Sequence, residues 1–84
     1  MMPKTLGDIR HKELVRILIQ KRRDAGLRQV ELAQQMKVYQ SLIARLESGE
    51  RRVDVVELIK LSEILSFDPA EIVRGLSSIE EPPI

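Results

Sequence analysis

Apolar residues recur along this chain at the three- to four-residue spacing of amphipathic helices. The first such stretch runs from about Asp8 to Ala25, where Leu14 and Leu18 fall on one face between charged residues. Gly26 follows directly, in the position at which glycine commonly ends a helix. The pattern therefore predicts a long amphipathic helix near the N-terminus.

Four shorter helices are expected after it, at Gln29–Met36, Gln40–Ser48, Asp54–Leu65 and Pro69–Leu76. Gly49 stands where the second of these four should stop. Asp54 and Asp68 are suitable N-caps, and Pro69 suits the first position of a helix. The sequence thus predicts an all-α domain over residues 1–78, followed by an acidic, proline-containing tail at residues 79–84.

The last two predicted helices carry more apolar residues than one core needs. A set at helical spacing is expected to face the core: Val55, Leu58, Leu61, Leu65 and Ile72. A second set is left over: Val56, Ile59, Val73, Leu76 and Ile79. Because a leftover apolar patch on a small domain usually marks an interface, we expect this second set to form the contact surface of a homodimer.

Composition limits what a chain of 84 residues can be. With 43% apolar and 32% charged residues it lies in the range of folded globular proteins and has room for one domain. The absence of cysteine excludes a disulfide framework and a thiolate zinc site. The longest apolar run, Ile17–Ile19, is far too short to span a bilayer, and no signal-peptide pattern precedes it. A cytoplasmic protein is expected.

Charge is distributed unevenly along the chain. Residues 1–60 hold 13 Lys/Arg against 8 Asp/Glu, whereas residues 61–84 hold 1 against 5. A basic body with an acidic end suits a polyanion on one side of the molecule and a protein surface on the other.

The segment from Gly26 to Arg51 carries several features at defined offsets. They are Gly-Leu-x-Gln before the predicted helix 29–36, Glu-Leu-Ala inside it, Val at the turn, Ile and Arg in the next helix, and then Glu-x-Gly-x-Arg. This segment resembles the helix-turn-helix of the phage Cro and repressor family, the XRE family, over about residues 14–76. The resemblance implies a compact, five-helix, lambda-repressor-like DNA-binding domain whose helix-turn-helix comprises the helices at 29–36 and 40–48.

The physical requirements of such a motif are met by apolar residues around the turn. Ala33 is small enough for two helices to cross closely, and Val38 and Ile43 anchor either side of the bend. Leu32, Met36 and Leu46 complete the predicted wedge. We expect these six residues to be core residues that position the groups that read DNA.

The opposite face of the helix at 40–48 is polar. It carries Gln40, Ser41, Ala44 and Arg45, at spacings that bring them together on one side. In a major groove, Gln can pair with adenine, Arg with guanine, and Ala can touch a thymine methyl. The resemblance implies that these four residues contact bases.

The resemblance also implies residues that flank the readers. Gln29 matches a phosphate-binding Gln at a helix start, and Arg51 and Arg52 are candidates for a second phosphate clamp. Arg22 and Glu47 match an ion pair that ties the first helix to the end of the recognition helix.

Three residues depart from the family pattern. Lys37 stands in place of the usual Gly, Tyr39 in place of a capping Ser or Thr, and Arg28 in place of Thr or Ser before the helix at 29–36. Glu31 occupies the second half of a capping box, although Arg28 cannot accept the amide bond of the first half. Since all three lie near the proposed DNA face, Arg28 and Tyr39 are further candidates for phosphate contacts.

An enzyme is not expected. His11, the only histidine, has no cysteine or carboxylate cluster at ligand spacing and is predicted to be a surface residue. There is also no nucleophile-base pair and no phosphate-cradling glycine loop. We therefore expect no metal, no cofactor and no small-molecule effector.

The leading interpretation is a sequence-specific regulator of transcription, a repressor or autoregulator, that binds a palindromic operator in double-stranded DNA as a homodimer. Two others stay open. An antitoxin-like module would repress its own promoter and hold a toxin with the last helix or the tail, where Ile79 and Ile84 accompany acidic residues. An oligomeric adaptor would keep the fold without binding DNA.

Overall fold

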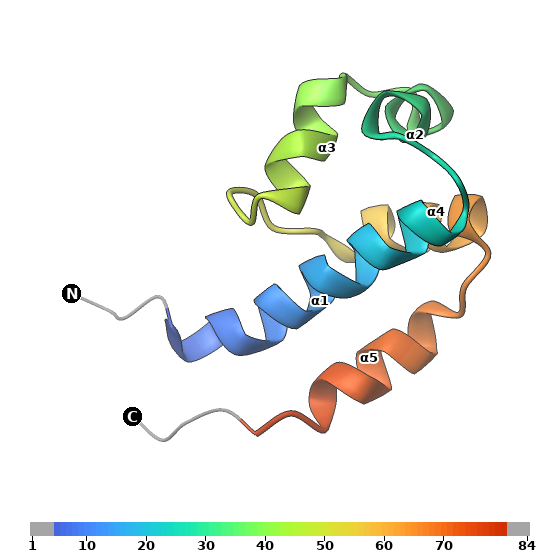
Figure 1. Cartoon of the computed structure of the whole chain (residues 1–84). Helices are drawn as coiled ribbons and strands as arrows, with labels where there is room; N and C mark the ends of the chain where they lie inside the picture. Colours follow the sequence, from blue (N-terminus) through green and yellow to red (C-terminus); the bar gives the residue numbers. More distant parts are fainter. Residues whose placement is uncertain (1–4, 81–84) are drawn as a thin grey trace.

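The computed structural model describes residues 5–80, which form five α-helices and no strand (Figure 1). The helices are α1 (Thr5–Asp24), α2 (Gln29–Met36), α3 (Gln40–Glu47), α4 (Val55–Leu65) and α5 (Pro69–Ser77). The predicted all-α, five-helix fold is confirmed. None of the helices in residues 5–80 is both long and apolar enough to cross a bilayer.

The helix ends follow local chemistry. α1 closes with Lys21, Arg22 and Arg23 in its last turn, where positive charge interacts favourably with the helix dipole, and Gly26 then adopts φ 74°. α4 begins with a capping box in which the Asp54 carboxylate accepts the Glu57 N–H at 2.7 Å. At α5, the Asp68 side chain accepts the Ala70 N–H at 2.9 Å and Pro69 follows it.

The core lies where α1, α2, α3 and α4 meet. Its buried residues are Leu18, Leu32, Ala33, Met36, Ile43, Leu46, Leu58, Leu61 and Leu65. Of the predicted wedge, five residues are buried and Val38 packs against them from a partly buried position. This confirms that the turn between α2 and α3 is held by aliphatic packing.

One core prediction is wrong. Val55, expected to face inward, is 71% exposed. It lies in the first turn of α4, and Val53, just before the helix, packs against the core at this end instead. Val55 therefore joins the exposed apolar residues of α4.

α5 lies alongside α1 (Figure 1), and its C-terminal end is hydrogen-bonded to Arg10 on α1. The Arg10 guanidinium donates to the Ile79 carbonyl oxygen at 2.9 and 3.2 Å and to that of Ser77 at 3.4 Å. Residue 79, predicted as the start of the tail, is thus attached to the domain. Residues 81–84, on which the toxin-binding interpretation also depends, lie outside the described residues.

The turn between α2 and α3 keeps a left-handed backbone without glycine. Lys37 has φ 61° and ψ 44°, a conformation that costs an L residue about 1 kcal/mol. Its N–H still reaches the Gln34 carbonyl oxygen at 3.2 Å, so the helix end is satisfied despite the strain.

Replacing Lys37 by glycine is expected to stabilise the domain by about 1 kcal/mol, because glycine adopts this backbone without the steric penalty. For a domain of this size the thermal midpoint should rise by about 4–8 °C. Lys37→Ala is the control, since it removes the same charge but keeps the Cβ. A rise in both variants, measured by thermal unfolding, would attribute the effect to charge rather than to backbone strain.

Candidate nucleic-acid interface

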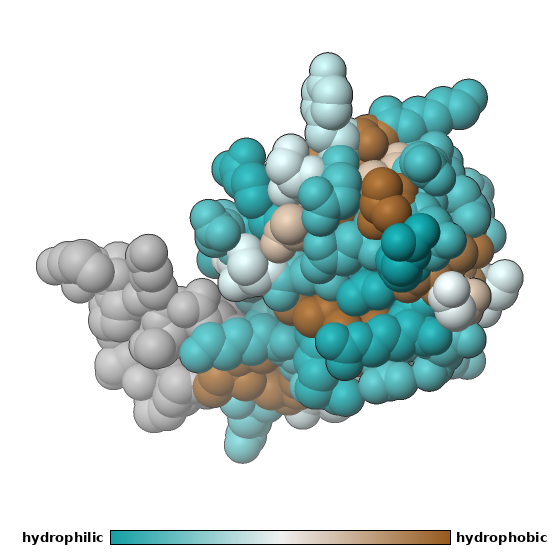
Figure 2. All heavy atoms as spheres, turned by 45° about the horizontal axis from the view of Figure 1, so that its top comes forward, coloured by the Kyte–Doolittle hydropathy of each residue, from teal (hydrophilic) through white to brown (hydrophobic). Residues whose placement is uncertain are grey.

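α2 and α3 stand at the end of the molecule away from α5 (Figure 1). On α3, Ile43 and Leu46 are only 1% and 4% exposed, which turns the opposite face of the helix to solvent. Of the predicted base-reading residues, Gln40, Ser41 and Arg45 are exposed and Ala44 is half-buried. Figure 2 turns this end forward and shows that hydrophilic side chains cover most of it.

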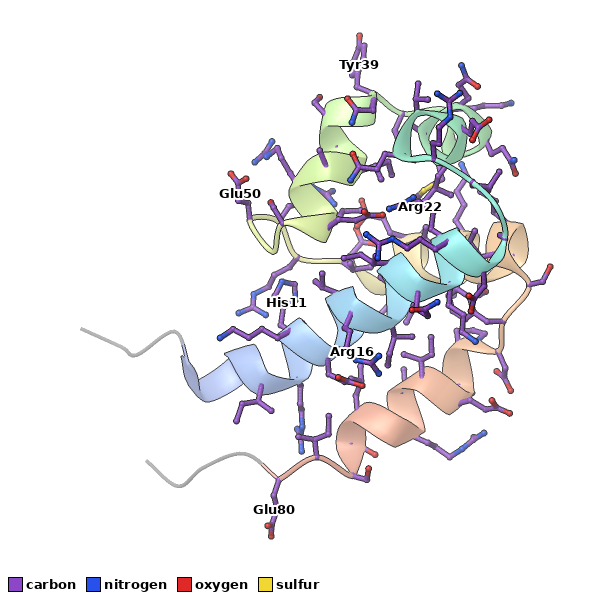
Figure 3. The ribbon with its side chains drawn as sticks, in the orientation of Figure 1. His11, Arg16, Arg22, Tyr39, Glu50 and Glu80 are labelled. Atoms are coloured by element: carbon purple, nitrogen blue, oxygen red, sulfur yellow. The ribbon has the colours of Figure 1, made fainter. Side chains whose placement is uncertain are left out.

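Arg22 and Glu47 lie in direct contact beneath this face. Arg22 Nε donates to one carboxylate oxygen of Glu47 at 2.6 Å and Nη2 to the other at 3.0 Å. Its third nitrogen, Nη1, donates to the Leu27 carbonyl oxygen at 2.8 Å. Both side chains are nearly buried, so the guanidinium joins α1, the α1–α2 loop and the end of α3 in one planar arrangement (Figure 3).

Two glutamines extend this cluster to the surface. Gln29 Nε2 donates to the Glu47 carboxylate at 2.9 Å, and Gln29 Oε1 accepts from Gln40 Nε2 at 2.8 Å. The chain of bonds runs from the buried pair through the start of α2 to the first residue of α3. Sequence reasoning assigned Gln29 and Gln40 separate roles and missed their contact, although each is the first residue of its helix.

Arg28 is exposed beside the start of α2. Its backbone N–H donates to the Glu31 carboxylate at 2.7 Å, and its Nε lies 3.4 Å from the same carboxylate. These interactions, the backbone hydrogen bond first, hold the pKa of Glu31 below its usual range. The Glu31 half of the capping box is therefore formed, as predicted, while no hydrogen bond from the Arg28 side chain caps the helix.

The two arginines after α3 differ in their surroundings. Arg51 donates through both terminal nitrogens to the Glu57 carboxylate, at 3.0 and 2.6 Å, whereas Arg52 is exposed and has no acidic partner among the side chains described at residues 9–80. Glu57 also accepts the Asp54 N–H at 3.0 Å. The spacing Asp54-x-x-Glu57 is a capping-box signal that sequence reasoning had not used.

The Arg51 guanidinium is the main reason that the pKa of Glu57 lies below its usual range; the Asp54 N–H adds to it. A lowered pKa means that the Arg51–Glu57 pair contributes to stability above the unfolded-state pKa of the carboxyl. This contribution is lost as the pH falls through the lowered, folded-state value. The loop between α3 and α4 is therefore held by this pair at neutral pH.

A hollow of about 650 Å³ opens beside the exposed face of α3. It is lined by Lys37, Val38, Tyr39, Ser41, Leu42 and Arg45. Tyr39 precedes α3 with its side chain 86% exposed, projects from the tip of the molecule (Figure 3) and makes no capping hydrogen bond. The turn and the exposed face of α3 thus share one concave surface.

The residues predicted for a dimer contact lie on α4, on α5 and just after α5. Val56 and Ile59 on α4 and Val73 on α5 are exposed, at 75%, 45% and 53% respectively. Leu76 and Ile79 are half-buried. Val55, in the first turn of α4, adds to the exposed apolar residues of that helix.

His11 is not the surface residue that was predicted. It is half-buried on α1 (Figure 3), and its Nε2 is shielded from solvent without a hydrogen-bond partner in the described part of the chain. The reason is its place in the inward stripe of α1, which continues through Leu14, Leu18 and Arg22 at helical spacing.

Comparisons with known proteins agree with this geometry. The family described as helix-turn-helix matches residues 18–72. Among solved structures, the chain is similar to an XRE-family like protein from Pseudomonas syringae pv. tomato str. DC3000, with 32% sequence identity and a TM-score of 0.80. That similarity covers 89% of this chain and 92% of the other. No curated protein matches.

Proposed function

The chain belongs to the XRE family of helix-turn-helix proteins, a family of DNA-binding regulators, and on this basis we propose that it binds specific DNA sequences by inserting α3 into the major groove. The observation that carries the proposal is the exposed polar face of α3. That face is held by buried Ile43 and Leu46 and by the Arg22–Glu47 pair. Packing behind the helix in this way fixes the α3 backbone from which the exposed side chains project, without DNA.

The contact between the two glutamines supports a reading role for Gln40. One hydrogen of Gln40 Nε2 is engaged by Gln29. The second hydrogen and Oε1 remain for N7 and the N6 amine of an adenine, the two groups that a glutamine can bind together. Gln29 therefore orients the amide of Gln40. It is also the first residue of α2, where a phosphate would meet the N–H groups of the helix N-terminus.

Phosphate contacts are expected on either side of α3. Arg28 and Tyr39 extend from the α2 side and the turn, and Arg52 from the loop beyond α3. Arg51 is paired with Glu57, so its contribution to phosphate binding competes with that ion pair. Arg52 is for this reason the stronger candidate for a phosphate clamp in this loop.

Arg52→Ala is expected to weaken binding to all DNA sequences by a similar factor and to reduce the slope of log affinity against log salt by about one. The physical reason is that a phosphate contact releases a counterion but reads no base. Binding titrations at several salt concentrations, on the preferred and on an unrelated duplex, measure both effects. A loss confined to the preferred duplex would contradict the phosphate assignment.

We propose that two copies pair through the exposed apolar residues of α4 and α5, with recognition helices about 34 Å apart to match half-sites one helical turn apart. Val55, Val56 and Ile59 form the α4 part of this surface, and Val73 belongs to its α5 part. A dimer doubles the DNA contact of a small module and explains why apolar side chains remain exposed.

The pairing surface is tested by Ile59→Glu, which should convert the dimer to a monomer in light scattering because it places a charge in an apolar contact. Val30→Glu on α2 introduces the same charge at another exposed apolar position and should leave the mass unchanged. A wild-type protein that is monomeric at micromolar concentration, with one copy bound per full site, would refute the dimer.

The function as a whole is tested by selecting preferred duplexes from a random pool and titrating the purified protein with the selected duplex and with a scrambled duplex. A regulator of this kind should bind the selected duplex with at least about a thousandfold higher affinity. Equal affinities that both fall steeply with salt would indicate only non-specific electrostatic binding. No binding at low salt would favour the adaptor interpretation.

A further inference from the structure

The loop that joins α3 to α4, residues 48–54, holds its two arginines in different states. Arg52 is exposed, whereas both terminal nitrogens of Arg51 donate to the Glu57 carboxylate, at 3.0 and 2.6 Å. The side chain of Arg51 is nevertheless 31% exposed and that of Glu57 18%. The guanidinium of Arg51 is therefore bound by its own chain but remains within reach of a ligand in solvent.

We propose that Glu57 sets the affinity of the protein for the DNA backbone, by holding Arg51 until a phosphate takes its place. Arg51 is bound to Glu57 in the free protein and transfers to a phosphate in the complex. The inference rests on the proposed DNA-binding function. It adds Glu57, a residue that itself makes no contact with DNA, to those that determine how tightly DNA is bound.

The carboxylate and the phosphate require the same donors. Each binds arginine best through two parallel N–H groups, and Glu57 already occupies those of the two terminal nitrogens. Glu57 is ionised at neutral pH, because the Arg51 guanidinium and then the Asp54 N–H hold its pKa below the usual range. A phosphate that approached while Glu57 stayed bound would meet a second negative charge, which repels it. Binding of one anion therefore opposes binding of the other.

Glu57 keeps other partners when Arg51 leaves. Its carboxylate accepts the Asp54 N–H at 3.0 Å, and the Asp54 carboxylate accepts the Glu57 N–H at 2.7 Å. Glu57 also lies in the first turn of α4, where the helix dipole favours a negative charge. The capping box of α4 is thus preserved while Arg51 moves, and the exchange requires no unfolding of the helix.

The buried pair of Arg22 and Glu47 differs from this one in the properties that govern release. Its shortest contact is also 2.6 Å, but the two side chains are only 10% and 11% exposed. Arg22 is held further by the Leu27 carbonyl oxygen at 2.8 Å. The additional bond of Arg51, to the Arg52 carbonyl oxygen, is longer, at 3.3 Å, and exposed. Arg51 is consequently the arginine that a phosphate can capture.

Glu57→Gln tests the proposal, because it removes the charge but keeps an oxygen that accepts the Asp54 N–H. Affinity should rise by about two- to fivefold, the usual strength of a partly exposed ion pair. The rise should be similar for the selected duplex and for a scrambled duplex, since a phosphate contact reads no base. The slope of log affinity against log salt should steepen by about one, because Arg51 now releases a counterion without freeing a carboxylate. Unchanged or lower affinity would overturn the proposal.

The same substitution in an Arg51→Ala background is the control. Without the arginine there is nothing for Glu57 to withhold, so Glu57→Gln should no longer raise affinity. A gain of equal size in both backgrounds would mean that removing any negative charge has this effect, and the proposal would be overturned. Failure of the DNA-binding function itself is distinguishable, because the wild-type protein would then bind neither duplex at low salt.

The exchange can also be followed in the wild-type protein, without any variant. The carboxyl carbon of Glu57, observed by NMR, should shift when the selected duplex is added, since its arginine partner leaves. The carboxyl carbon of Glu13, which is paired with Arg16 on the solvent side of α1, should not. A Glu57 signal that stays in place while the protein becomes saturated with DNA would show that the pair remains closed and would overturn the proposal.

Discussion

Glu47→Ala is expected to destabilise the domain by about 3 kcal/mol, because it leaves the nearly buried guanidinium of Arg22 without its carboxylate. For a domain of this size the thermal midpoint should fall by about 12 °C or more. The loss also removes the acceptor for Gln29 Nε2 and so releases the chain of bonds that ends at Gln40. Thermal unfolding followed by circular dichroism measures the first effect.

The exposed ion pair between Arg16 and Glu13 provides the control. It has the same short contact, 2.6 Å, but lies on the solvent side of α1. Glu13→Ala should leave the midpoint nearly unchanged, since water screens an exposed pair. If both variants lost similar stability, burial would not be the cause.

A double variant separates stability from orientation. Arg22→Met with Glu47→Leu replaces the buried pair by apolar groups and should recover much of the lost stability. It cannot restore the acceptor for Gln29, so the double variant should fold yet discriminate less at the base pair read by Gln40. Full recovery of both properties would mean that the pair contributes only packing.

Arg45→Ala is expected to lower affinity for the preferred duplex by about 5- to 150-fold and to relax the base preference at one position of each half-site. Arg45 is exposed on α3 and has no acidic partner among the side chains described at residues 9–80, so its guanidinium remains available for both acceptors of a guanine. Selection from a random pool with wild type and variant measures the change.

Arg23→Ala is the matched control, because it removes the same charge from an exposed position on α1. It should leave the selected sequence unchanged. Arg45→Lys adds a second comparison: it keeps the charge but not the two parallel donors, and should therefore retain affinity better than base preference. An unchanged preference in Arg45→Ala would remove Arg45 from the set of readers.

Much of the fold was predictable because its signals are local. The bounds of α2 were predicted to the residue, since Gln29 follows a loop with glycine and the apolar residues through Met36 share one period. Asp54 and Asp68 cap their helices as expected. α1 begins three residues before its predicted start, at Thr5, because helix starts without a strong cap leave little trace in a sequence.

The errors and omissions arise where tertiary contacts decide. Periodicity placed Val55 on the inward stripe, but it cannot show that Val53, just before the helix, packs against the core at this end instead. Arg51 had a motif position and a positive charge, yet its partner Glu57 is brought to it only by the fold of the loop. The Gln29–Gln40 contact likewise depends on the angle between two helices, which the residue types do not specify.

α1 is fastened at two points that serve different surfaces. Arg10 binds the end of α5, and Arg22, twelve residues further along the same helix, binds the end of α3. An α-helix rises about 1.5 Å per residue, so one rigid rod holds these anchors about 18 Å apart. α1 therefore sets the distance from the α5 part of the proposed pairing surface to the recognition face. Inserting a single residue between the two arginines would turn one anchor by about 100° relative to the other, and the protein would lose its preference for half-site spacing before its affinity for one half-site.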